Sequence, residues 1–473
     1  MPVSKRVANV PDVKLPSPDQ LPFGEVTAAC VSLLLVFVFA ARAITSSLWL
    51  DETATYWVIK DGLQNVFRRC WEWTGASAPY DLLAWVSSLL APAIGIEPAL
   101  RLPSLVAMAI AAALVYQLGR YMADQRTGLL SAVAFLCIHP VAFAAIDARP
   151  YALGLALLVA SMLFLLKWLD SSRRLYAVIY VIASALVVYT HYLLALGLVA
   201  QLVYGRRHIR KLAPLWLAIG ALCLPLGGHL LNLFETRQAH VFSSTPSLSL
   251  FLAAVAPASL AAAVLLTIMF SRRPAVASIP IPRQLLLVWF FFPPVFLFLV
   301  SILSDTKLFY PRYYLSSAPA VAILAGYAVS RMGNVSMASL LFVAVYTITF
   351  WQSSSEHVSE NWRGAMAALN AQATAEDTVL VASAFVEGTP QDINRRDVLF
   401  APQLVYPIGP MFRLPSNFDE KAIPADLLQK RRVFLVAVQR QMEYASWLVH
   451  HLPGYRAESL GSFGAVVVLK FEK

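Results

Sequence analysis

The sequence predicts a polytopic α-helical membrane protein that ends in a small α/β soluble domain. Hydrophobic residues make up 59% of the 473 residues and charged residues only 14%, and the mean hydropathy is +0.64. Soluble domains carry about 25% charged residues, so this composition excludes an ordinary soluble protein. Long apolar runs alternate with short segments in which Lys and Arg cluster, which is the pattern of membrane-spanning helices.

The chain divides into three parts. Residues 1–24 are polar and proline-rich, which predicts a disordered cytoplasmic tail. Residues 25–351 contain about eleven apolar runs near the ~20 residues that a bilayer needs. The first run, 26–41, is expected to be an uncleaved anchor. The other expected spans are 102–119, 128–146, 150–168, 175–190, 192–204, 212–232, 248–270, 284–303, 313–330 and 335–351.

Residues 352–473 have a different composition. Three short β-branched runs, 378–382, 432–438 and 465–469, predict buried strands. A helix is expected from Asn361 to Asn370, and the proline-rich stretch 390–424 is expected to form loops. About 120 residues are enough for a separate core.

The basic residues predict the orientation. With the N-terminus inside, the inner segments carry about twice as many Lys and Arg as the outer ones. This distribution places the protein in a bacterial inner membrane, with the N-terminus cytoplasmic and the C-terminal domain periplasmic. It also accounts for the net charge of +10 through membrane topology, so no nucleic-acid partner is expected.

The first outer loop, 49–101, begins with the stretch Trp49-Leu50-Asp51-Glu52. Two adjacent carboxylates at a membrane boundary are costly to place there and indicate a functional site. Further along, 57–63 is expected to form a short amphipathic helix. The stretch 82–96 is too short and broken to span, so it is expected to lie at the membrane interface.

Other unusual polar residues fall on the same outer side of the predicted topology. They are Asp147 and Arg149 in a tight turn, His191 and Tyr192 between two spans, and Lys307, Arg312 and Tyr313 before the tenth span. A carboxylate can serve as a general base, and a planar guanidinium matches the oxygens of a phosphate. Two possibilities for a cofactor stay open. The protein uses no cofactor, or Asp51, Asp147 and His191 hold a divalent cation (Mg²⁺ or Mn²⁺).

Four stretches in this order resemble the GT-C superfamily of membrane glycosyltransferases. They are Trp49–Glu52, Ala99–Ser104, Asp147–Leu153 and Pro311–Leu315. The resemblance covers about residues 42–369 and is to the family 39-type group, which includes protein O-mannosyltransferases and the lipid A aminoarabinose transferase. It implies an inverting transferase that moves a sugar from a polyprenyl-phosphate donor to an acceptor on the periplasmic face.

The resemblance also implies roles for individual residues. Asp51 would be the catalytic base and Asp147 a second acidic residue, while Arg149 and Arg312 would bind the donor phosphate. Glu52 is expected to join the catalytic acids, and Lys307 and Tyr313 the phosphate site. The expected acceptor-side or orienting residues are His191, Tyr192, Tyr80 and Arg101.

Two departures from the family pattern leave the acceptor open among a protein, a lipid and a glycan. Relatives often carry a Pro-Pro-Leu-Tyr type motif where this chain reads Ala78-Pro79-Tyr80-Asp81-Leu82, and many have Glu in place of Asp147. The sugar is equally open.

Two other functions compete with transfer. A transporter or flippase of a lipid-linked substrate would explain the spans, but the chain lacks the internal repeat that many transporters show and has few charges deep in its spans. A non-catalytic envelope scaffold would need the outer domain but not Asp51.

Overall fold

The computed structural model describes residues 26–27, 30–35, 38, 43–73, 75–235, 245–255, 264–265, 281–332, 336–344, 360–383, 401–407, 409, 411–415 and 418–473. The predicted tail 1–24 lies outside the described residues. Parts of the predicted spans 26–41, 248–270 and 335–351 also lie outside them.

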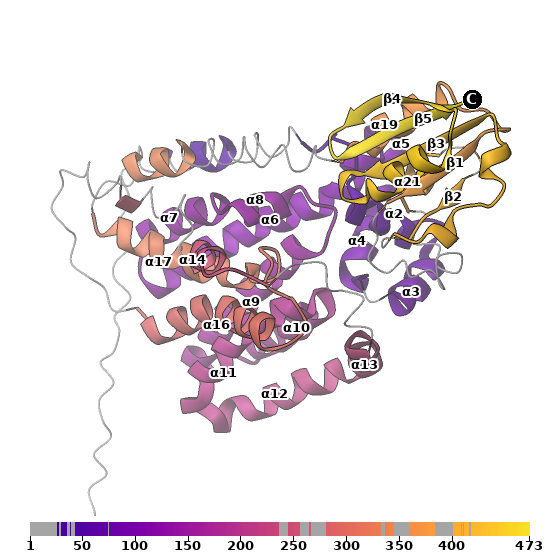
Figure 1. Ribbon diagram of the computed structural model, residues 1–473. Helices are drawn as coiled ribbons and strands as arrows, with labels where there is room; N and C mark the ends of the chain where they lie inside the picture. Colours follow the sequence, from indigo (N-terminus) through magenta and orange to yellow (C-terminus); the bar gives the residue numbers. More distant parts are fainter. Residues whose placement is uncertain are drawn as a thin grey trace, which may run out of the picture.

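The N-terminal part is helical (Figure 1). The helices before the first long span are α2 (Leu50–Ile59), α3 (Leu63–Glu72), α4 (Ala78–Ser88) and α5 (Ala91–Ile94). The helices that follow are α6 (Ile96–Met122), α7 (Gln125–Leu136), α8 (His139–Ala145), α9 (Tyr151–Ser171), α10 (Arg174–Thr190), η1 (Tyr192–Leu198), α11 (Val199–Gly205), η2 (Arg206–His208), α12 (Ile209–Cys223), η3 (Leu224–Leu226), α13 (Gly227–Glu235), α14 (Leu248–Val255), α16 (Arg283–Leu303), η5 (Leu315–Ser317) and α17 (Ala318–Ser330).

Among the described residues, four helical segments are long and apolar enough to cross a membrane. They are α6, α9, the continuous run Tyr192–Glu235 and α16; α7 and α8, bent by 76° at their junction, make a fifth if they count as one broken span. The shorter apolar helices are α10 and the segment Leu315–Ser330. All of these overlap predicted spans. The polytopic helical class is therefore confirmed, while the total of about eleven spans stays a prediction.

The run Tyr192–Glu235 folds back on itself. Its 44 residues would extend about 66 Å as one straight helix, about twice the hydrocarbon thickness. A Cβ added at Gly205 would lie 2.5 Å from Leu212 and 2.9 Å from Trp216, which in a straight helix would lie about 10 and 16 Å further along the axis. The chain therefore reverses at η2, in agreement with the two predicted spans 192–204 and 212–232.

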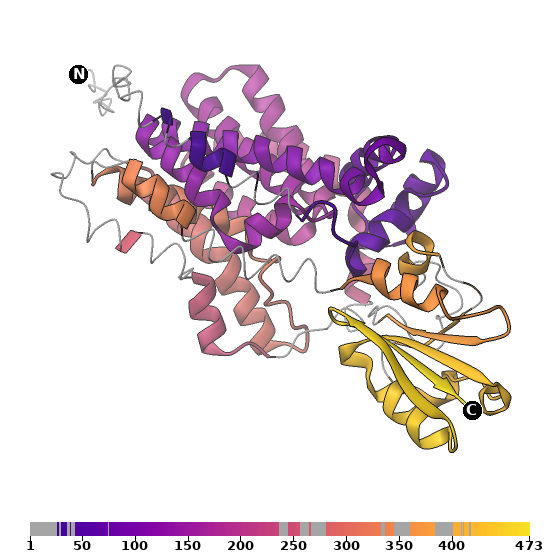
Figure 2. The ribbon, with the colours of Figure 1, turned by 90° about the horizontal axis from the view of Figure 1, so that it is seen from above.

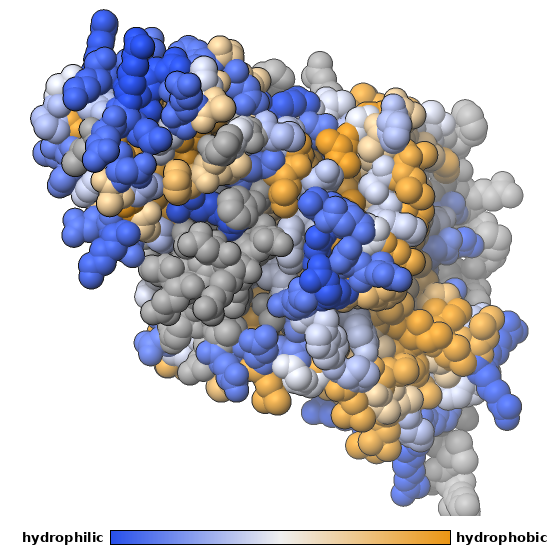
Figure 3. All heavy atoms as spheres, turned by 90° about the vertical axis from the view of Figure 1, so that its right-hand side faces the viewer, coloured by the Kyte–Doolittle hydropathy of each residue, from blue (hydrophilic) through white to orange (hydrophobic). Residues whose placement is uncertain are grey.

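Exposed apolar side chains cover the outside of the helical part. Leu217, Leu224 and Leu303 are 75%, 75% and 80% exposed, a degree of exposure that suits contact with lipid chains. Figure 3 shows hydrophobic side chains gathered over the lower right of the face it presents, whereas the upper left is mostly hydrophilic. The surface thus separates a lipid-facing part from a water-facing part.

The C-terminal part is a mixed five-stranded sheet with the strand order β2-β1-β3-β5-β4. Its strands are β1 (Thr378–Ala382), β2 (Phe412–Arg413), β3 (Arg432–Val438), β4 (Arg456–Phe463) and β5 (Val466–Glu472). β1 pairs in parallel with β2 and β3, and β5 pairs antiparallel with β3 and β4. The helices are α19 (Trp362–Asn370), α20 (Ala401–Val405) and α21 (Glu443–His451), with short 3₁₀ turns η7 (Glu420–Ala422), η8 (Leu427–Gln429) and η9 (Gln439–Gln441).

The three predicted strands and the helix beginning at Asn361 are confirmed. Asn361 is the N-cap of α19, because its side chain accepts a hydrogen bond from the Gly364 N–H at 2.9 Å. The expectation of loops over 390–424 was wrong in part, since α20 and β2 lie there. β4 was not predicted, because an exposed strand rich in polar residues lacks the β-branched pattern.

The two parts share one hydrophobic core. Leu48, Leu50 and Trp57 pack in the same cluster as Trp362 of α19 and Val381 of β1. Figures 1 and 2 show the α/β domain at one end of the helical part, where α20 packs against α2. The beginning of the first outer loop is therefore buried between the two parts.

The prediction of one short helix over 57–63 was wrong in its bounds. α2 begins at Leu50 and ends at Ile59, and the next helix starts at Leu63. Between them Asp61 and Gly62 have φ of 71° and 94°, a left-handed region that glycine adopts easily and that a helix cannot contain. Asp51 and Glu52 consequently lie in the first turn of α2 rather than in an open loop.

Candidate functional site

The two adjacent acids of α2 point in different directions, because neighbouring residues on a helix are about 100° apart. The Asp51 side chain is 28% exposed and forms an ion pair with Arg312 at 2.7 Å from Oδ2 to the guanidinium. The Glu52 side chain has no exposed surface. One acid is therefore accessible from outside and the other belongs to the interior.

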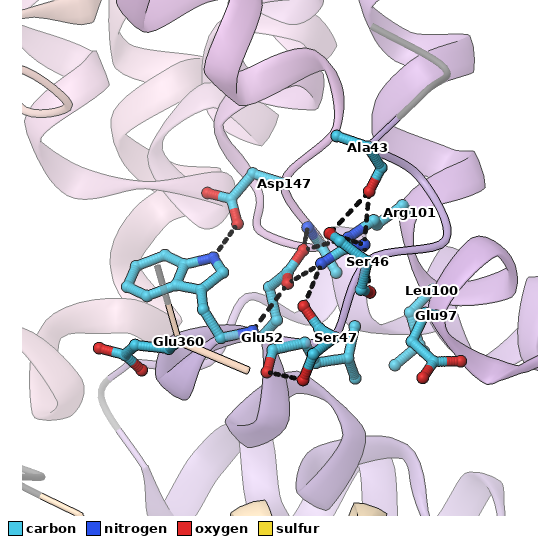
Figure 4. A network of polar contacts seen from close by, with 12 residues as sticks. Ala43, Ser46, Ser47, Glu52, Glu97, Leu100, Arg101, Asp147 and Glu360 are labelled. Carbon is cyan, nitrogen blue, oxygen red and sulfur yellow. Dashed lines mark hydrogen bonds and ion pairs between the residues drawn. The ribbon is translucent and has the colours of Figure 1, made fainter. Parts of the chain in front are cut away.

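Glu52 and Arg101 form a buried clamp (Figure 4). Arg101, on α6, donates from Nε to Glu52 Oε1 at 2.7 Å and from a terminal nitrogen to Oε2 at 2.5 Å. Its other donors reach the carbonyls of Ala43, Ile44, Ser46 and Ser47. Glu52 also accepts from the backbone N–H groups of Ala148 and Trp49, at 2.8 and 3.1 Å.

These contacts bear on two of the predicted site residues. Both side chains of the clamp are fully buried and are held by groups of the protein itself. The structure therefore does not support a catalytic role for Glu52 or an acceptor-binding role for Arg101. The clamp instead joins three segments: the chain before α2, α6 and the turn after α8.

Asp147 lies in that turn and is 1% exposed. Its Oδ1 accepts a hydrogen bond from the Trp49 indole at 3.0 Å, and Oδ2 has no partner among the described residues. Burial raises the pKa of Asp147 well above its ordinary value, and the nearby charge of Glu52 raises it further. The carboxyl group is thus driven toward its neutral form.

Arg149, two residues later, is 8% exposed. Its guanidinium donates to the carbonyls of Gly75 at 3.1 Å and Asp51 at 3.4 Å, and it lies 5.6 Å from the Trp73 ring. Nε is buried without a partner among the described residues. An unpartnered buried donor is costly, so the site is suited to an additional acceptor.

Arg312 approaches from the segment before η5. Besides Asp51, it lies 4.9 Å from the ring of Tyr310, 5.6 Å from that of Trp49 and 5.7 Å from that of Tyr313. Aromatic faces hold a guanidinium in a fixed place without neutralising it. The structure therefore brings Asp51, Arg149, Arg312 and Tyr313 together, as predicted.

His191 joins this group and Tyr192 does not. The His191 ring lies 5.1 Å from Tyr151 and 5.8 Å from Tyr313. Burial lowers the pKa of His191 to about 3, helped by the charges of Arg149 and Arg312, so its imidazole is neutral at pH 7. The Tyr192 hydroxyl instead bonds to His229 Nδ1 at 2.6 Å.

Two further predicted residues have other partners. The Lys307 ammonium donates to the carbonyls of Ser301 and Ser304, both at 2.9 Å, which caps the end of α16. The Tyr80 side chain is fully buried, and its hydroxyl donates to the Leu100 carbonyl at 3.1 Å. The structure thus gives Lys307 a capping role and Tyr80 an internal one, and the expected substrate role of Tyr80 is not supported.

Two acids near the site were not among the predicted site residues. Asp81 accepts from the Ser77 N–H at 2.7 Å and from the Cys70 thiol at 3.5 Å, and burial raises its pKa to about 6. The only hint of Asp81 in the sequence was that it lies where residues 78–82 depart from the family's Pro-Pro-Leu-Tyr type motif. Glu360 accepts from the Leu50 N–H at 3.0 Å, and no sequence pattern links residues 310 positions apart.

The three residues that could hold a divalent cation have other neighbours in the structure. Among the described residues, no three His, Cys, Asp or Glu side chains converge in a way that could hold an ion. Asp51 is paired with Arg312, Asp147 accepts from Trp49, and two arginines lie close to His191. Positive charge beside a ligand set opposes cation binding.

A family model described as dolichyl-phosphate-mannose-protein mannosyltransferase matches residues 81–227. The crystal structure of ArnT from Cupriavidus metallidurans bound to undecaprenyl phosphate matches with a TM-score of 0.62, and its apo state with 0.61. In both, identity is 13%, and the match covers 94% of this chain and 97% of the other.

A comparison with curated protein sequences found no match. At 13% identity the structural likeness concerns the fold, and it includes the C-terminal domain because it covers almost the whole chain. The matched family segment contains Asp147, Arg149 and His191. The chain therefore shares the fold of ArnT over almost its whole length.

Proposed function

We propose that the protein is an integral-membrane inverting glycosyltransferase that moves a sugar from a polyprenyl-phosphate donor to an acceptor on the periplasmic face. The observation that carries the proposal is the Asp51–Arg312 ion pair beside Arg149. The carboxylate proposed as the base and the two arginines proposed to bind phosphate thus lie side by side. A solved structure with the same fold, that of ArnT, contains bound undecaprenyl phosphate.

The charges of the site favour an anion. Arg149 and Arg312 are both cationic, Asp51 supplies one negative charge, and burial disfavours the charged forms of Asp147 and Asp81. The resulting excess of positive charge suits a phosphodiester that carries one negative charge. Arg149, whose buried Nε has no partner among the described residues, and Arg312 would bind the phosphate oxygens.

In the reaction, the acceptor O–H or N–H attacks the anomeric carbon of the sugar from the face opposite the phosphate. The new bond forms as the bond from the anomeric carbon to the phosphate oxygen breaks, and the configuration inverts. Polyprenyl phosphate leaves with the electron pair, and Asp51 takes the proton of the nucleophile. The two arginines stabilise the negative charge that grows on the leaving phosphate.

The Asp51–Arg312 ion pair fits a substrate-dependent exchange. Arg312 binds Oδ2 of Asp51 at 2.7 Å, so this carboxylate oxygen is occupied by the guanidinium. A donor phosphate that engages Arg312 would release the Asp51 carboxylate toward the acceptor. Base activation would thus follow donor binding, which protects the donor from premature attack by water.

Arg312→Gln is expected to weaken the binding of polyprenyl phosphate about 10- to 100-fold, because a charged hydrogen bond is lost. Binding can be followed by intrinsic fluorescence in lipid nanodiscs, since Trp49 and Trp73 lie 5.6 Å from Arg312 and Arg149. Lys307→Gln is the matched control and is expected to bind nearly as wild type. Equal weakening in both variants would contradict the phosphate role of Arg312.

Asp147→Asn is expected to retain transfer within about tenfold of wild type. The carboxyl group is already driven toward its neutral form, and the amide oxygen can still accept from the Trp49 indole. The measurement is the transfer rate at pH 7 in the two proteins. A loss of a thousandfold or more would mean that the negative charge of Asp147 takes part in the reaction.

A further inference from the structure

The backbone just before Asp51 is held by the C-terminal domain. The Leu48 N–H donates to the Tyr406 hydroxyl at 2.9 Å, and the Leu50 N–H donates to Glu360 Oε2 at 3.0 Å. The N–H between them, that of Trp49, is taken by Glu52. Two of these three consecutive donors therefore reach across to the other domain.

Glu360 acts as a cap on α2. The first N–H groups of a helix have no partner within the helix, and a carboxylate there also meets the positive end of the helix dipole. Leu50 is the first residue of α2, so its bond to Glu360 fixes the turn that contains Asp51. The Trp362 indole donates to the same carboxylate oxygen at 3.1 Å, which holds it in place.

Glu360 is itself anchored in the sheet. Its backbone bridges to Gly464 between β4 and β5, and the Asn361 N–H donates to the Phe463 carbonyl at 3.1 Å. Burial raises the pKa of Glu360, and its bonds to Trp362 and Leu50 and the charge of Arg440, just after β3, offset part of this rise. Glu360 therefore connects the first turn of α2 to the sheet of the C-terminal domain.

We propose that Glu360 is a positioning residue for sugar transfer: from the C-terminal domain it caps α2 and holds Asp51 in register with Arg312. The proposal assigns the outer domain a direct part in the reaction. Small displacements of a catalytic group reduce rate strongly, and the first turn of a helix frays when its cap is lost. The kinetic part of this inference rests on the proposed function.

The test compares Glu360→Ala with Glu360→Gln, whose amide oxygen can still accept from Leu50. Arg363→Gln is the matched control, because it breaks the 3.0 Å ion pair to Glu97 and the bond to the Thr45 carbonyl at the same domain interface but leaves the bond from Leu50 to Glu360 in place. We expect the alanine variant to lose about tenfold or more in kcat with unchanged binding of polyprenyl phosphate. The glutamine variant and the control are expected to stay within about threefold of wild type.

A second readout, hydrogen–deuterium exchange of peptides covering 48–59, does not depend on activity. We expect faster exchange in Glu360→Ala only. Wild-type kcat and exchange in the alanine variant, or equal changes in the control, would overturn the proposal. If the alanine variant does not fold, Glu360→Asp, which is one methylene shorter, replaces it. If the wild type transfers no sugar, the proposed function fails. The hydrogen–deuterium exchange of residues 48–59 still shows whether Glu360 caps α2.

Discussion

Asp51→Asn is expected to lower the transfer rate by about a thousandfold or more while leaving donor binding within about threefold of wild type. The amide is nearly isosteric and can still accept from Arg312, so the site keeps its shape. It cannot take the proton of the acceptor, and a positioned general base contributes about 10²–10⁴ in rate. The measurements are single-turnover transfer and polyprenyl-phosphate binding on the same preparations.

Asp61→Asn is the matched control for this prediction. Asp61 is also an acid at a helix boundary of the first outer loop, but its side chain is 49% exposed and pairs with Lys60 and Arg69. We expect wild-type transfer from this variant. Full activity in Asp51→Asn would show that another group takes the proton, and a parallel loss of donor binding would show that Asp51 shapes the phosphate site instead.

Glu52→Gln is expected to destabilise the protein by about 3–5 kcal/mol, because it leaves the buried Arg101 charge without its counter-ion. Arg101→Met is expected to lower the stability of the protein by a similar amount, because it leaves the buried Glu52 charge without its counter-ion. Both side chains have no exposed surface, so neither charge can be hydrated. The measurement is the thermal unfolding midpoint in detergent at pH 7.

The double variant Glu52→Gln/Arg101→Met tests the cause. Replacing both partners of a buried ion pair removes the unpaired charge, so the double variant is expected to be more stable than the sum of the two single losses predicts. Additive losses would mean that Glu52 and Arg101 act through separate contacts. Normal stability of the single variants would contradict the clamp.

Much of this arrangement could be predicted from the sequence. The apolar runs place the main helices, because a bilayer imposes a length and a composition that are easily read. The ordered motifs predict that Asp51, Arg149 and Arg312 meet, and the structure brings them together. The strands β1, β3 and β5 follow from their β-branched runs.

The roles of individual polar residues were harder to predict. Asp51 and Glu52 are adjacent and both acidic, and only the rotation of α2 separates an accessible carboxylate from a buried one. Arg101 appears in a family motif, as a catalytic residue would, but its contacts are structural. Glu360 contacts α2 through the tertiary fold alone, and such long-range contacts leave no local pattern.

Release of free polyprenyl phosphate from a panel of polyprenyl-phosphate sugars tests the central claim most directly. Purified wild type in lipid would be supplied with crude envelope acceptors, with Asp51→Asn run beside it. We expect the wild type to consume one donor of the panel and Asp51→Asn to consume none. Equal release of polyprenyl phosphate by both proteins would contradict the proposed mechanism and remove Asp51 from it.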